Sequence, residues 1–387
     1  MKCLFIISDL DMGGITSSLR NLCNELVNKG AQVDILNLPK VKRLPNGFDK
    51  RVRLVPVFGK AIYWNLGMEN VAEARLLKKP FLLCLGLVKK ILTRYKKWNL
   101  FIFSQMPKLT GYDAAIAFRQ GPTNYYIVSH KTDAKYKVGF WHGDPTYMGD
   151  TSLWDSCVYE MDRIACVSDA VSSEMEKKYP PLVGKVCTVY NIFDADQIKK
   201  QGEESAVVLN QNYFNIVTVA RIEFEQKQLQ MIPVICRKLK QAGALFNWTI
   251  VGDGPDMLQL KQLIEQEKVS DCLLLVGSKE NPYPYIKQAD LFVLTSIWES
   301  YGMVIMESLI LGTPVVASEY PALKEILSHE KEGMIAPNCL EGVFETVYQV
   351  ITDEKLYQKL KANCMEYKYD SEFTYKQFLK LIGENDA

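Results

Sequence analysis

The chain has 387 residues, of which 48% are hydrophobic and 24% are charged, and its formal net charge is +1. This length exceeds what one compact core usually holds, so two domains of an ordinary folded protein are expected. A net charge this close to zero creates no overall field that would attract nucleic acid, and no nucleic acid partner is expected.

The ten cysteines and the N-terminus indicate the compartment. No C-x-x-C pair occurs, and Cys3, Cys166, Cys187 and Cys272 lie in or beside apolar runs. Buried free thiols in a reducing environment are therefore expected. The N-terminal apolar run has only the length of one strand, and no stretch is long and apolar enough to span a membrane. The sequence predicts a cytoplasmic protein.

The first half of the chain alternates apolar strand-like segments with helical ones. A strand at 3–8, a helix at 13–30 ending at Gly30 and a strand at 31–38 form a β-α-β unit. Further strands are predicted at 112–118, 135–141 and 163–168, with a helix from Ser168 onward. Continuous apolar strands separated by helices indicate a parallel sheet covered on both faces.

The second half repeats this pattern after a polar segment, 197–212, that reads as an interdomain linker. Strands are predicted at 215–220, 247–252, 271–277, 290–295 and 313–318. The prediction is an α/β fold of two Rossmann-like doubly wound domains facing a ligand-binding cleft, with a C-terminal helix packing back on the first domain. The expected boundaries are 1–200 for the first domain, 201–370 for the second and 371–387 for the returning helix.

Glu299 and Glu307 stand eight residues apart around a tyrosine and a glycine. On one straight helix they would be about 12 Å apart, which is too far for a glycosidase pair at about 5 to 9.5 Å. A loop followed by a helix starting near Gly302 is the better reading. Amides of Gly302 and Met303 would then favour a phosphate. Glu307 could bind paired hydroxyls of one sugar, and Glu299 could bind a second sugar; the alternative is two surface carboxylates.

Other residues at predicted strand ends also suit a ligand made of sugars and phosphate. Arg221 and Lys227 follow the strand at 215–220 and suit a departing diphosphate, although isolated cations are commonly surface charges. Gly13 and Gly14 form a loop and a helix start that could close over the phosphates. His142 follows the strand at 135–141, where a sugar-binding or catalytic role competes with a structural one.

Cofactor and metal motifs are weak in this chain. The fingerprint G-x-G-x-x-G is absent, and the run at 252–257 lacks the third glycine, so no nicotinamide cofactor is expected. The D-x-D pattern at 9–11 abuts the glycine loop of a first strand, and no metal is expected.

Taken together, these residues resemble the retaining glycosyltransferases of family 4 with the GT-B fold. The element E-x7-E corresponds to Glu299 and Glu307 and is followed by "LGTPVVAS"; "VARIEFEQK" resembles the phosphate-binding loop of the family. "RIACVSDAVSSEM", "VYNIFD", "WTIVGDGP" and the "MGG" turn follow the family order. The resemblance is strong from 135 to 320 and weak from 40 to 110.

The resemblance implies a role for each matching residue. Arg221 and Lys227 would bind the donor diphosphate, and Glu307 the ribose hydroxyls. Glu299 would contact the transferred sugar in a pocket lined by Tyr301, Gly302 and Met303, and His142 would support that sugar near its reacting carbon. The interval from Arg221 to Lys227 is six residues, longer than in many relatives, and Gln228 stands where glycine is common.

The implied reaction moves a hexose or N-acetylhexosamine from a nucleoside-diphosphate sugar, with UDP expected, to a sugar acceptor with retention at the anomeric carbon. No metal and no further cofactor are implied. The leaving phosphate can serve as the base, so no protein base is required. A nucleotide-sugar epimerase of the same fold, or a non-catalytic nucleotide-sugar-binding partner subunit, remains as an alternative.

The acceptor side is indicated by a basic amphipathic stretch. The run from Arg75 to Lys97 holds eight basic residues and no acidic one, interleaved with apolar runs. Such a segment is typical of an interfacial helix pair on an anionic membrane, or of a core helix with a basic edge. With the first reading, we expect a glycan or lipid-linked glycan acceptor, peripheral attachment to the inner face of the cell membrane, and a role in bacterial surface-polysaccharide or capsule assembly.

Overall fold

The computed structural model describes residues 1–10, 13–38, 43–56, 103–104, 106–147, 155–204, 209–210 and 212–383. The chain folds into two compact units. Unit 1 comprises Met1–Ile192 and Glu372–Ala387, and unit 2 comprises Phe193–Ser371. The basic segment 75–97, for which a membrane contact is expected, lies outside the described residues.

Unit 1 is built, within its described residues, on a seven-stranded sheet of order β3-β2-β1-β4-β5-β6-β7. All neighbouring strands run parallel, and Phe5 of β1 lies between Ile35 of β2 and Ile116 of β4. The strands are β1 (Lys2–Ile7), β2 (Gln32–Asn37), β3 (Arg53–Val55), β4 (Ala114–Ala117), β5 (Tyr136–Trp141), β6 (Arg163–Cys166) and β7 (Val186–Thr188).

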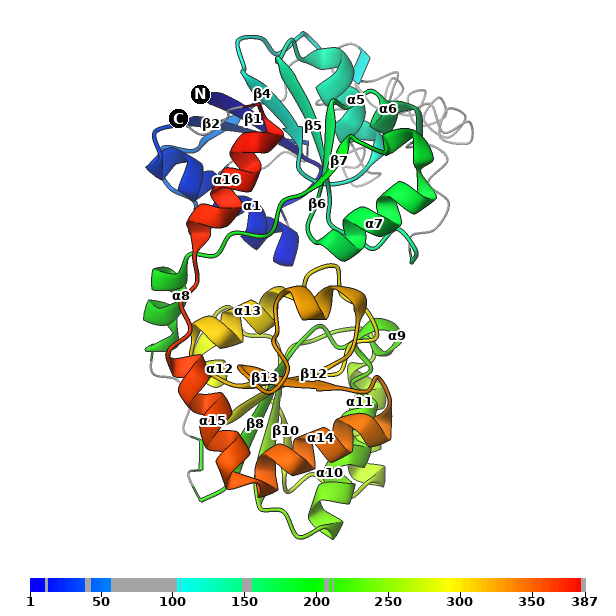
Figure 1. The fold of residues 1–387 in the computed structure, drawn as a ribbon, viewed down its shortest axis with the longest axis vertical. Helices are drawn as coiled ribbons and strands as arrows, with labels where there is room; N and C mark the ends of the chain where they lie inside the picture. Colours follow the sequence, from blue (N-terminus) through cyan, green and yellow to red (C-terminus); the bar gives the residue numbers. More distant parts are fainter. Residues whose placement is uncertain are drawn as a thin grey trace, which may run out of the picture. The chain divides into compact units, whose positions relative to one another are not determined.

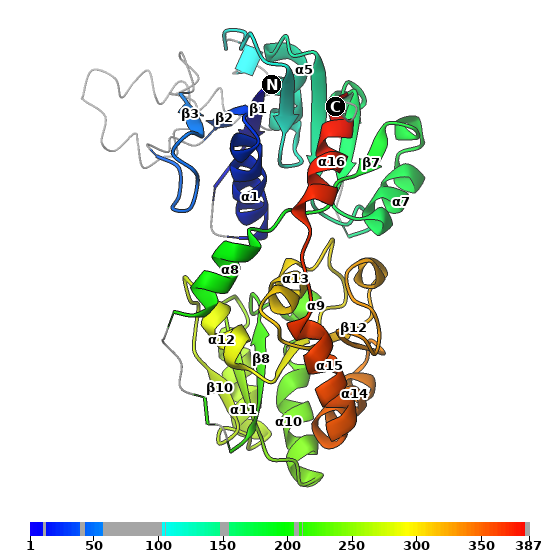
Figure 2. The same ribbon diagram turned by 60° about the vertical axis from the view of Figure 1, so that its left-hand side comes forward.

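Helices cover both faces of the unit 1 sheet (Figure 1). Phe5 of β1 packs with α1 and α16, whereas Leu4 packs with α5, α6 and α7, because successive strand side chains point to opposite faces. Figure 2 shows α16, at the red end of the chain, lying within unit 1. The helices are α1 (Gly14–Asn28), α5 (Pro122–Lys131), α6 (Asp155–Tyr159), α7 (Asp169–Lys178), the 3-10 helix Pro180–Leu182 and α16 (Ser371–Leu381).

Unit 2 repeats the plan with a six-stranded parallel sheet of order β10-β9-β8-β11-β12-β13 among its described residues. The strands are β8 (Phe214–Val219), β9 (Phe246–Val251), β10 (Leu273–Leu275), β11 (Leu291–Leu294), β12 (Val315–Ser318) and β13 (Gly333–Ala336). The helices are α8 (Ala195–Gly202), α9 (Phe224–Lys227), α10 (Met231–Gln241), α11 (Met257–Gln266), α12 (Tyr283–Gln288), α13 (Met303–Ile310), the 3-10 helix Pro321–Glu325, α14 (Leu340–Thr352) and α15 (Glu354–Met365). The α/β class predicted from the strand and helix rhythm is confirmed.

The predicted linker at 197–212 is wrong over its first part. Residues 197–202 belong to helix α8, which packs on α12 and α13 inside unit 2. Ile198 is buried, and a Cβ built on Gly202 would lie 2.7 Å from Cδ2 of Leu311. The polar surface of this helix hid its apolar contacts in the sequence. The division between the units falls after Ile192, ahead of the helix, and not at 200.

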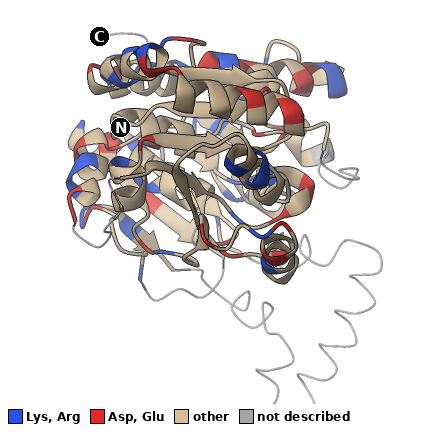
Figure 3. Cartoon of the chain, turned by 90° about the horizontal axis from the view of Figure 1, so that it is seen from below, with Lys and Arg blue, Asp and Glu red and all other residues tan. Residues whose placement is uncertain are grey.

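Surface charges of both signs are interspersed along the described helices (Figure 3). Ion pairs such as Lys240 with Asp271 and Arg237 with Glu267 join neighbouring elements of unit 2. Pairs of this exposed kind contribute little to stability. None of the described helices has both the length and the hydropathy needed to cross a bilayer.

The described cysteines are free thiols, as their spacing predicted. Cys3 and Cys166 are buried, whereas Cys187 and Cys272 are only partly buried and Cys339 is exposed. The expectation of burial therefore holds for Cys3 in β1 and Cys166 at the end of β6. It is wrong for Cys187 in β7 and for Cys272 just before β10, because these two strands lie at the edges of their sheets.

Phe378 should anchor α16 to unit 1. Its ring is fully buried and lies 6.3 Å from the ring of Phe5, at an interplanar angle of 19°. We expect Phe378→Ala to lower the free energy of unfolding of unit 1 by about 3–5 kcal/mol, as for other large-to-small core changes. Urea denaturation followed by tryptophan fluorescence measures this loss.

The matched control is Phe373→Ala on the same helix. Phe373 is 57% exposed, although it stacks on Tyr190. This variant should cost less than about 1 kcal/mol because little apolar area is uncovered. Equal losses for the two variants would show that α16 is not held through its buried face.

Candidate functional site

The strand orders place a switch point at the centre of each sheet. In unit 2 the chain proceeds from β8 outward to β10 and then returns to β11 on the other side of β8. The loops after β8 and β11 therefore leave the same edge of the sheet in opposite directions, and ligands of open α/β sheets bind at such a place. These two loops carry Arg221 and Glu299.

The loop after β8 is held by the glycines of the "GDGP" run. The amide of Ile222 donates to the carbonyl of Asp253 at 3.0 Å. A Cβ on Gly252 would lie 1.9 Å from the carbonyl oxygen of Ala220, and one on Gly254 would lie 2.2 Å from that of Ile222. Only glycine allows this approach of two backbones. Sequence reasoning tested the run as a dinucleotide fingerprint and missed this supporting role.

Lys227 and Glu299 form an ion pair that joins the two loops. The ammonium of Lys227, at the end of α9, donates to Oε1 of Glu299, and the two side chains are only 17% and 13% exposed. The hydroxyl of Ser296 donates to the same oxygen at 2.7 Å. The hydroxyl of Thr295 donates to the carbonyl of Lys227 at 2.6 Å. Two of the predicted site residues are therefore in direct contact.

Arg221 has a different environment from Lys227. Its side chain is 68% exposed, and its ion pair with Glu223 is long, at 3.9 Å between Nε and Oε2. A long exposed pair holds the guanidinium weakly, so the charge of Arg221 remains available to an anion. Gln228 ends α9 in the left-handed region, with φ 50° and ψ 33°. Glycine adopts this conformation without strain, and here glutamine adopts it.

The loop that carries Glu299 leads into the start of α13, whose first amides receive no side-chain cap from the described residues. The helix begins at Met303, as expected, and Gly302 before it has φ 92° and makes no side-chain cap. A Cβ on Gly302 would lie 2.3 Å from the hydroxyl of Tyr320. The ring of Tyr301 is buried and stacks on Phe193 at 6.3 Å, so this ring takes part in packing the loop.

Glu307 lies within α13 and is partly buried. The hydroxyl of Tyr283, the first residue of α12, donates to Oε1 of Glu307 at 3.2 Å. Helices α12 and α13 pack against each other, so this contact orients the carboxylate from a second element. Tyr283 was not singled out in the sequence, because its distance from Glu307 along the chain hides the contact.

His142 lies at the corresponding edge of unit 1, directly after β5. Its Nε2 contacts the carbonyl oxygen of Phe118 at 2.7 Å, and its ring packs against the rings of Phe118 and Phe140, with centroids at 4.8 and 5.7 Å. Because the partner is a carbonyl, Nε2 carries the proton. Burial lowers the pKa of His142 from 6.5 to about 4; the charge of Arg119 acts in the same direction, and the bond to Phe118 opposes both.

The remaining unit 1 candidates begin helix α1. Gly14 is its first residue, and Gly13 precedes it in an extended conformation with no side-chain cap. A Cβ on Gly13 would meet nothing within 4 Å among the described residues, so space alone does not require glycine there. Of the D-x-D pattern, Asp9 is described and pairs with Arg119, which follows β4.

The structure therefore gathers the predicted residues into two groups. Arg221, Lys227, Glu299, Gly302 and the start of α13 lie on the carboxyl edge of the unit 2 sheet, with Glu307 farther along α13. Gly13, Gly14 and His142 follow strands on the carboxyl edge of the unit 1 sheet. Each group is complete within its own unit.

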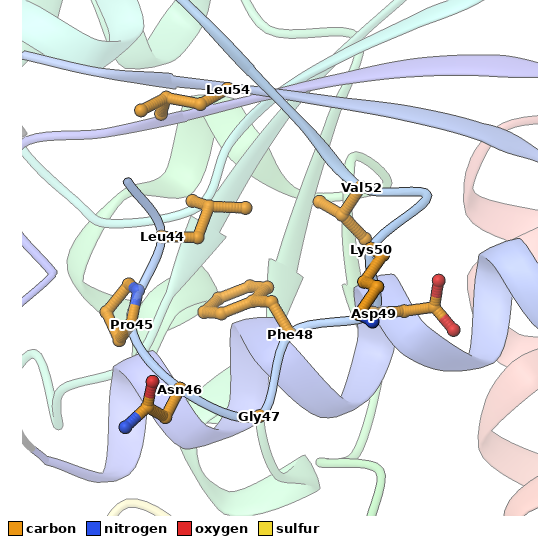
Figure 4. Close-up of a pocket in the computed structure, with 9 residues that line it drawn as sticks. All are labelled: Leu44, Pro45, Asn46, Gly47, Phe48, Asp49, Lys50, Val52 and Leu54. Atoms are coloured by element: carbon orange, nitrogen blue, oxygen red, sulfur yellow. The ribbon is translucent and has the colours of Figure 1, made fainter. Parts of the chain in front are cut away.

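A cavity of about 330 Å³ lies elsewhere in unit 1 (Figure 4). It is lined by the loop between β2 and β3 and by β3 itself, with Leu44 and Phe48 from the loop and Leu54 from the strand. A Cβ on Gly47, in this loop, would lie 2.9 Å from Cδ of Arg20 on α1. The cavity contains none of the predicted site residues.

Comparison with known proteins finds a glycosyltransferase family match within unit 2. Residues 200–366 match the family described as "Glycosyl transferases group 1". The chain is 38% identical over 179 residues to the amylovoran biosynthesis glycosyltransferase AmsK of Erwinia amylovora, covering 43% of this chain and 44% of AmsK. It is 26% identical over 203 residues to N-acetylgalactosamine-N,N'-diacetylbacillosaminyl-diphospho-undecaprenol 4-alpha-N-acetylgalactosaminyltransferase of Campylobacter jejuni, covering 51% of this chain and 54% of that protein. The chain thus spans about half the length of these curated relatives.

The structure of S. aureus TarM, solved with UDP, alpha-GlcNAc-glycerol and fondaparinux, superposes with a TM-score of 0.72. The match covers 99% of both chains at 15% identity, and at that identity it shows the fold alone. The GT-B architecture of two Rossmann-like units, predicted from the sequence, is confirmed. The resemblance to glycosyltransferases of bacterial surface polysaccharides is confirmed as well.

Burial of His142 should make stability depend on pH. The folded pKa is about 4, against 6.5 as the ordinary value, so the unfolded chain binds more protons between these two pH values. This contribution is intact above pH 6.5 and is lost as the pH falls towards 4, by about 3 kcal/mol in total. Urea titrations at several pH values measure the slope.

His142→Asn should flatten that slope between pH 4 and 6.5, since asparagine does not titrate but can still donate to Phe118. His130→Asn, which replaces a histidine with a 45% exposed side chain, is the matched control and should leave the wild-type slope in place. If His142→Asn kept the wild-type slope, the pH dependence of stability would not come from His142.

Gly302→Ala should destabilise unit 2 both through its positive φ and through the contact with Tyr320. Gly243 has φ 78° and no atom within 4 Å of a built Cβ, so Gly243→Ala isolates the cost of φ. We expect about 1 kcal/mol for Gly243→Ala and about 2–4 kcal/mol for Gly302→Ala, measured by urea denaturation. Adding Tyr320→Phe to Gly302→Ala should recover part of the difference; no recovery would exclude the hydroxyl as the obstacle.

Proposed function

Residues 200–366 form a domain of the glycosyl transferases group 1 family, and on this premise we propose that the protein is a retaining glycosyltransferase. It moves a hexose or N-acetylhexosamine from a nucleoside-diphosphate sugar to a sugar acceptor. The observation that carries the proposal is the meeting of Lys227 and Glu299 at the switch point of unit 2, next to the uncapped start of α13.

Each group on this edge suits one part of the donor. Arg221, Lys227 and the amides at the start of α13 would bind the diphosphate, because cations and helical N–H groups both favour anions. Glu307, oriented by Tyr283, would accept hydrogen bonds from the ribose hydroxyls. Glu299 would accept a hydrogen bond from a hydroxyl of the transferred sugar.

The chemistry follows from where charge develops. As the bond from the anomeric carbon to the diphosphate lengthens, positive charge grows on the sugar ring and negative charge on the phosphate oxygens. Arg221 and Lys227 would stabilise the phosphate charge as it develops, and such electrostatic stabilisation is the usual source of large rate gains. The departing phosphate takes the proton of the attacking hydroxyl, so no protein base is needed. These cations also supply the charge that a divalent metal would otherwise supply, and activity should survive EDTA.

His142 contributes an acceptor rather than a cation. Its lowered pKa keeps the ring neutral near pH 7, and Nε2 is engaged with Phe118. Nδ1 is then a hydrogen-bond acceptor, suited to a hydroxyl of the donor sugar. His142→Asn removes this acceptor, and unchanged donor turnover in that variant would exclude the role.

The donor and the acceptor are proposed from the relatives. UDP in the complex of TarM supports a UDP-sugar. The name of the Campylobacter jejuni relative supports a diphospho-undecaprenol-linked acceptor, and that of AmsK supports exopolysaccharide synthesis. We place the reaction in the cytoplasm, at the inner face of the cell membrane where such an acceptor would lie.

The test uses the full chain with UDP-glucose, UDP-galactose, UDP-N-acetylglucosamine and UDP-N-acetylgalactosamine, each with a polyprenyl-diphosphate-linked sugar. Release of UDP with a glycosylated product is expected for at least one donor. A rearranged UDP-sugar formed without acceptor would indicate an epimerase instead. Tight UDP-sugar binding without turnover over the whole panel would indicate a non-catalytic binder.

Lys227→Ala should reduce UDP release by about 10²-fold or more, because it removes a cation that stabilises charge in the transition state. Lys240→Ala is the matched control: Lys240 pairs with Asp271 and does not contact Glu299. This control should turn over at close to the wild-type rate. Equal rates for Lys227→Ala and wild type would reject the site.

A further inference from the structure

Three buried hydroxyls stand at the carboxyl ends of β11 and β12. Thr295 and Ser296 follow β11 directly, and Ser318 is the last residue of β12. All three are buried, although each carries a polar group. A buried hydroxyl costs free energy unless it finds a partner, so the partners of these three indicate what they hold in place.

The partners lead to the ion pair of the candidate site. Thr295 donates to the carbonyl of Lys227 at 2.6 Å, and Ser318 donates to the carbonyl of Ser296 at 2.6 Å. Ser296 in turn donates to Oε1 of Glu299 at 2.7 Å. The hydroxyl of Thr295 therefore fixes the backbone of Lys227, and that of Ser318 fixes the backbone of Ser296. The hydroxyl of Ser296 reaches the carboxylate of Glu299 itself.

Both donors to Glu299 use the same oxygen. The ammonium of Lys227 and the hydroxyl of Ser296 bind Oε1, and within the described parts of the chain Oε2 receives no hydrogen bond. The side chain of Glu299 is 13% exposed, so water has little access to it. An ionised carboxylate in such a place is stabilised by further donors. Oε2 is thus oriented through Oε1 and remains open to a hydroxyl group.

Lys227 alone would hold Glu299 less reliably than Ser296 does. The ammonium is a flexible point charge with three donors, which a bound diphosphate attracts. When the diphosphate binds, Lys227 turns at least part of its charge to the phosphate oxygens. Ser296 is buried, and its backbone is held by Ser318, so its hydroxyl stays on Oε1 of Glu299 whatever Lys227 does.

We propose that Ser296 is a positioning residue for recognition of the donor sugar. By holding Oε1 it presents Oε2 of Glu299 to a hydroxyl of the transferred sugar, so the site distinguishes a nucleotide sugar from the bare nucleotide. This inference rests on the proposed function, because it takes the Glu299 loop as the sugar subsite. The nucleoside diphosphate, bound by Arg221, Lys227 and α13, does not depend on Ser296.

The test compares the dissociation constants of UDP and of UDP-sugar by calorimetry. The UDP-sugar is whichever of UDP-glucose, UDP-galactose, UDP-N-acetylglucosamine and UDP-N-acetylgalactosamine binds the wild-type chain most tightly. We expect Ser296→Ala to weaken binding of that sugar nucleotide by about tenfold, the loss that follows when a hydrogen bond to a charged group is removed. Binding of UDP should stay within about twofold of wild type.

Two further variants separate positioning from a general structural role. Ser296→Cys keeps a weaker donor and should give an intermediate loss. Ser308→Ala removes an equally buried hydroxyl on α13, which donates to the carbonyl of Thr313 at 2.9 Å. This control should leave the ratio of the two dissociation constants unchanged. UDP binding by each variant also verifies that unit 2 is folded.

The outcomes are distinguishable. A wild-type chain that binds neither UDP nor any of the four UDP-sugars overturns the proposed UDP-sugar transferase, and this inference with it. Wild-type binding of both ligands with an unchanged ratio in Ser296→Ala overturns only the role of Ser296. Parallel losses of UDP and UDP-sugar in Ser296→Ala, or the same change of ratio in Ser308→Ala, would show a purely structural hydroxyl and overturn it as well.

Discussion

The ion pair between Lys227 and Glu299 is the contact on which the candidate site depends. It joins the loop after β8 to the loop after β11, two segments that are distant in the sequence and meet only because their strands are neighbours in the sheet. A cation and a carboxylate held this close, and mostly shielded from water, stabilise each other when the surrounding hydrogen bonds are also made. Here Thr295 and Ser296 make them.

The parallel sheet imposes the location of this pair. In a doubly wound sheet every strand ends at the same edge, and the loops separate where the strand order reverses. The glycines of the "GDGP" run let the loop after β9 support the loop after β8 at backbone distance, and Gly302 lets α13 begin beneath Tyr320. Glycine at these positions therefore serves close packing, and the positions of the candidate cations and amides depend on that packing.

A candidate residue of unit 1, His142, differs in chemistry from those of unit 2. His142 is kept neutral by burial against two aromatic rings, and its Nε2 proton is donated to the carbonyl of Phe118. A neutral acceptor of this kind suits a sugar hydroxyl, whereas the cations of unit 2 suit phosphate. The candidate residues of the two units thus differ in chemistry, with cations and helical amides in unit 2 and an uncharged hydrogen-bond acceptor in unit 1.

The sequence by itself determined the α/β class, the doubly wound pattern, the positions of Arg221, Lys227 and Glu299 after strands and the place of Glu307 on the helix that follows, because apolar periodicity and loop position are local properties. It misplaced the linker, since the apolar contacts of α8 depend on partners far along the chain. Only the tertiary structure decided that Lys227 binds Glu299, that Tyr283 reaches Glu307 and that Ser296 holds one carboxylate oxygen. Hydrogen bonds between different strands and helices depend on distances in space, which no local pattern encodes.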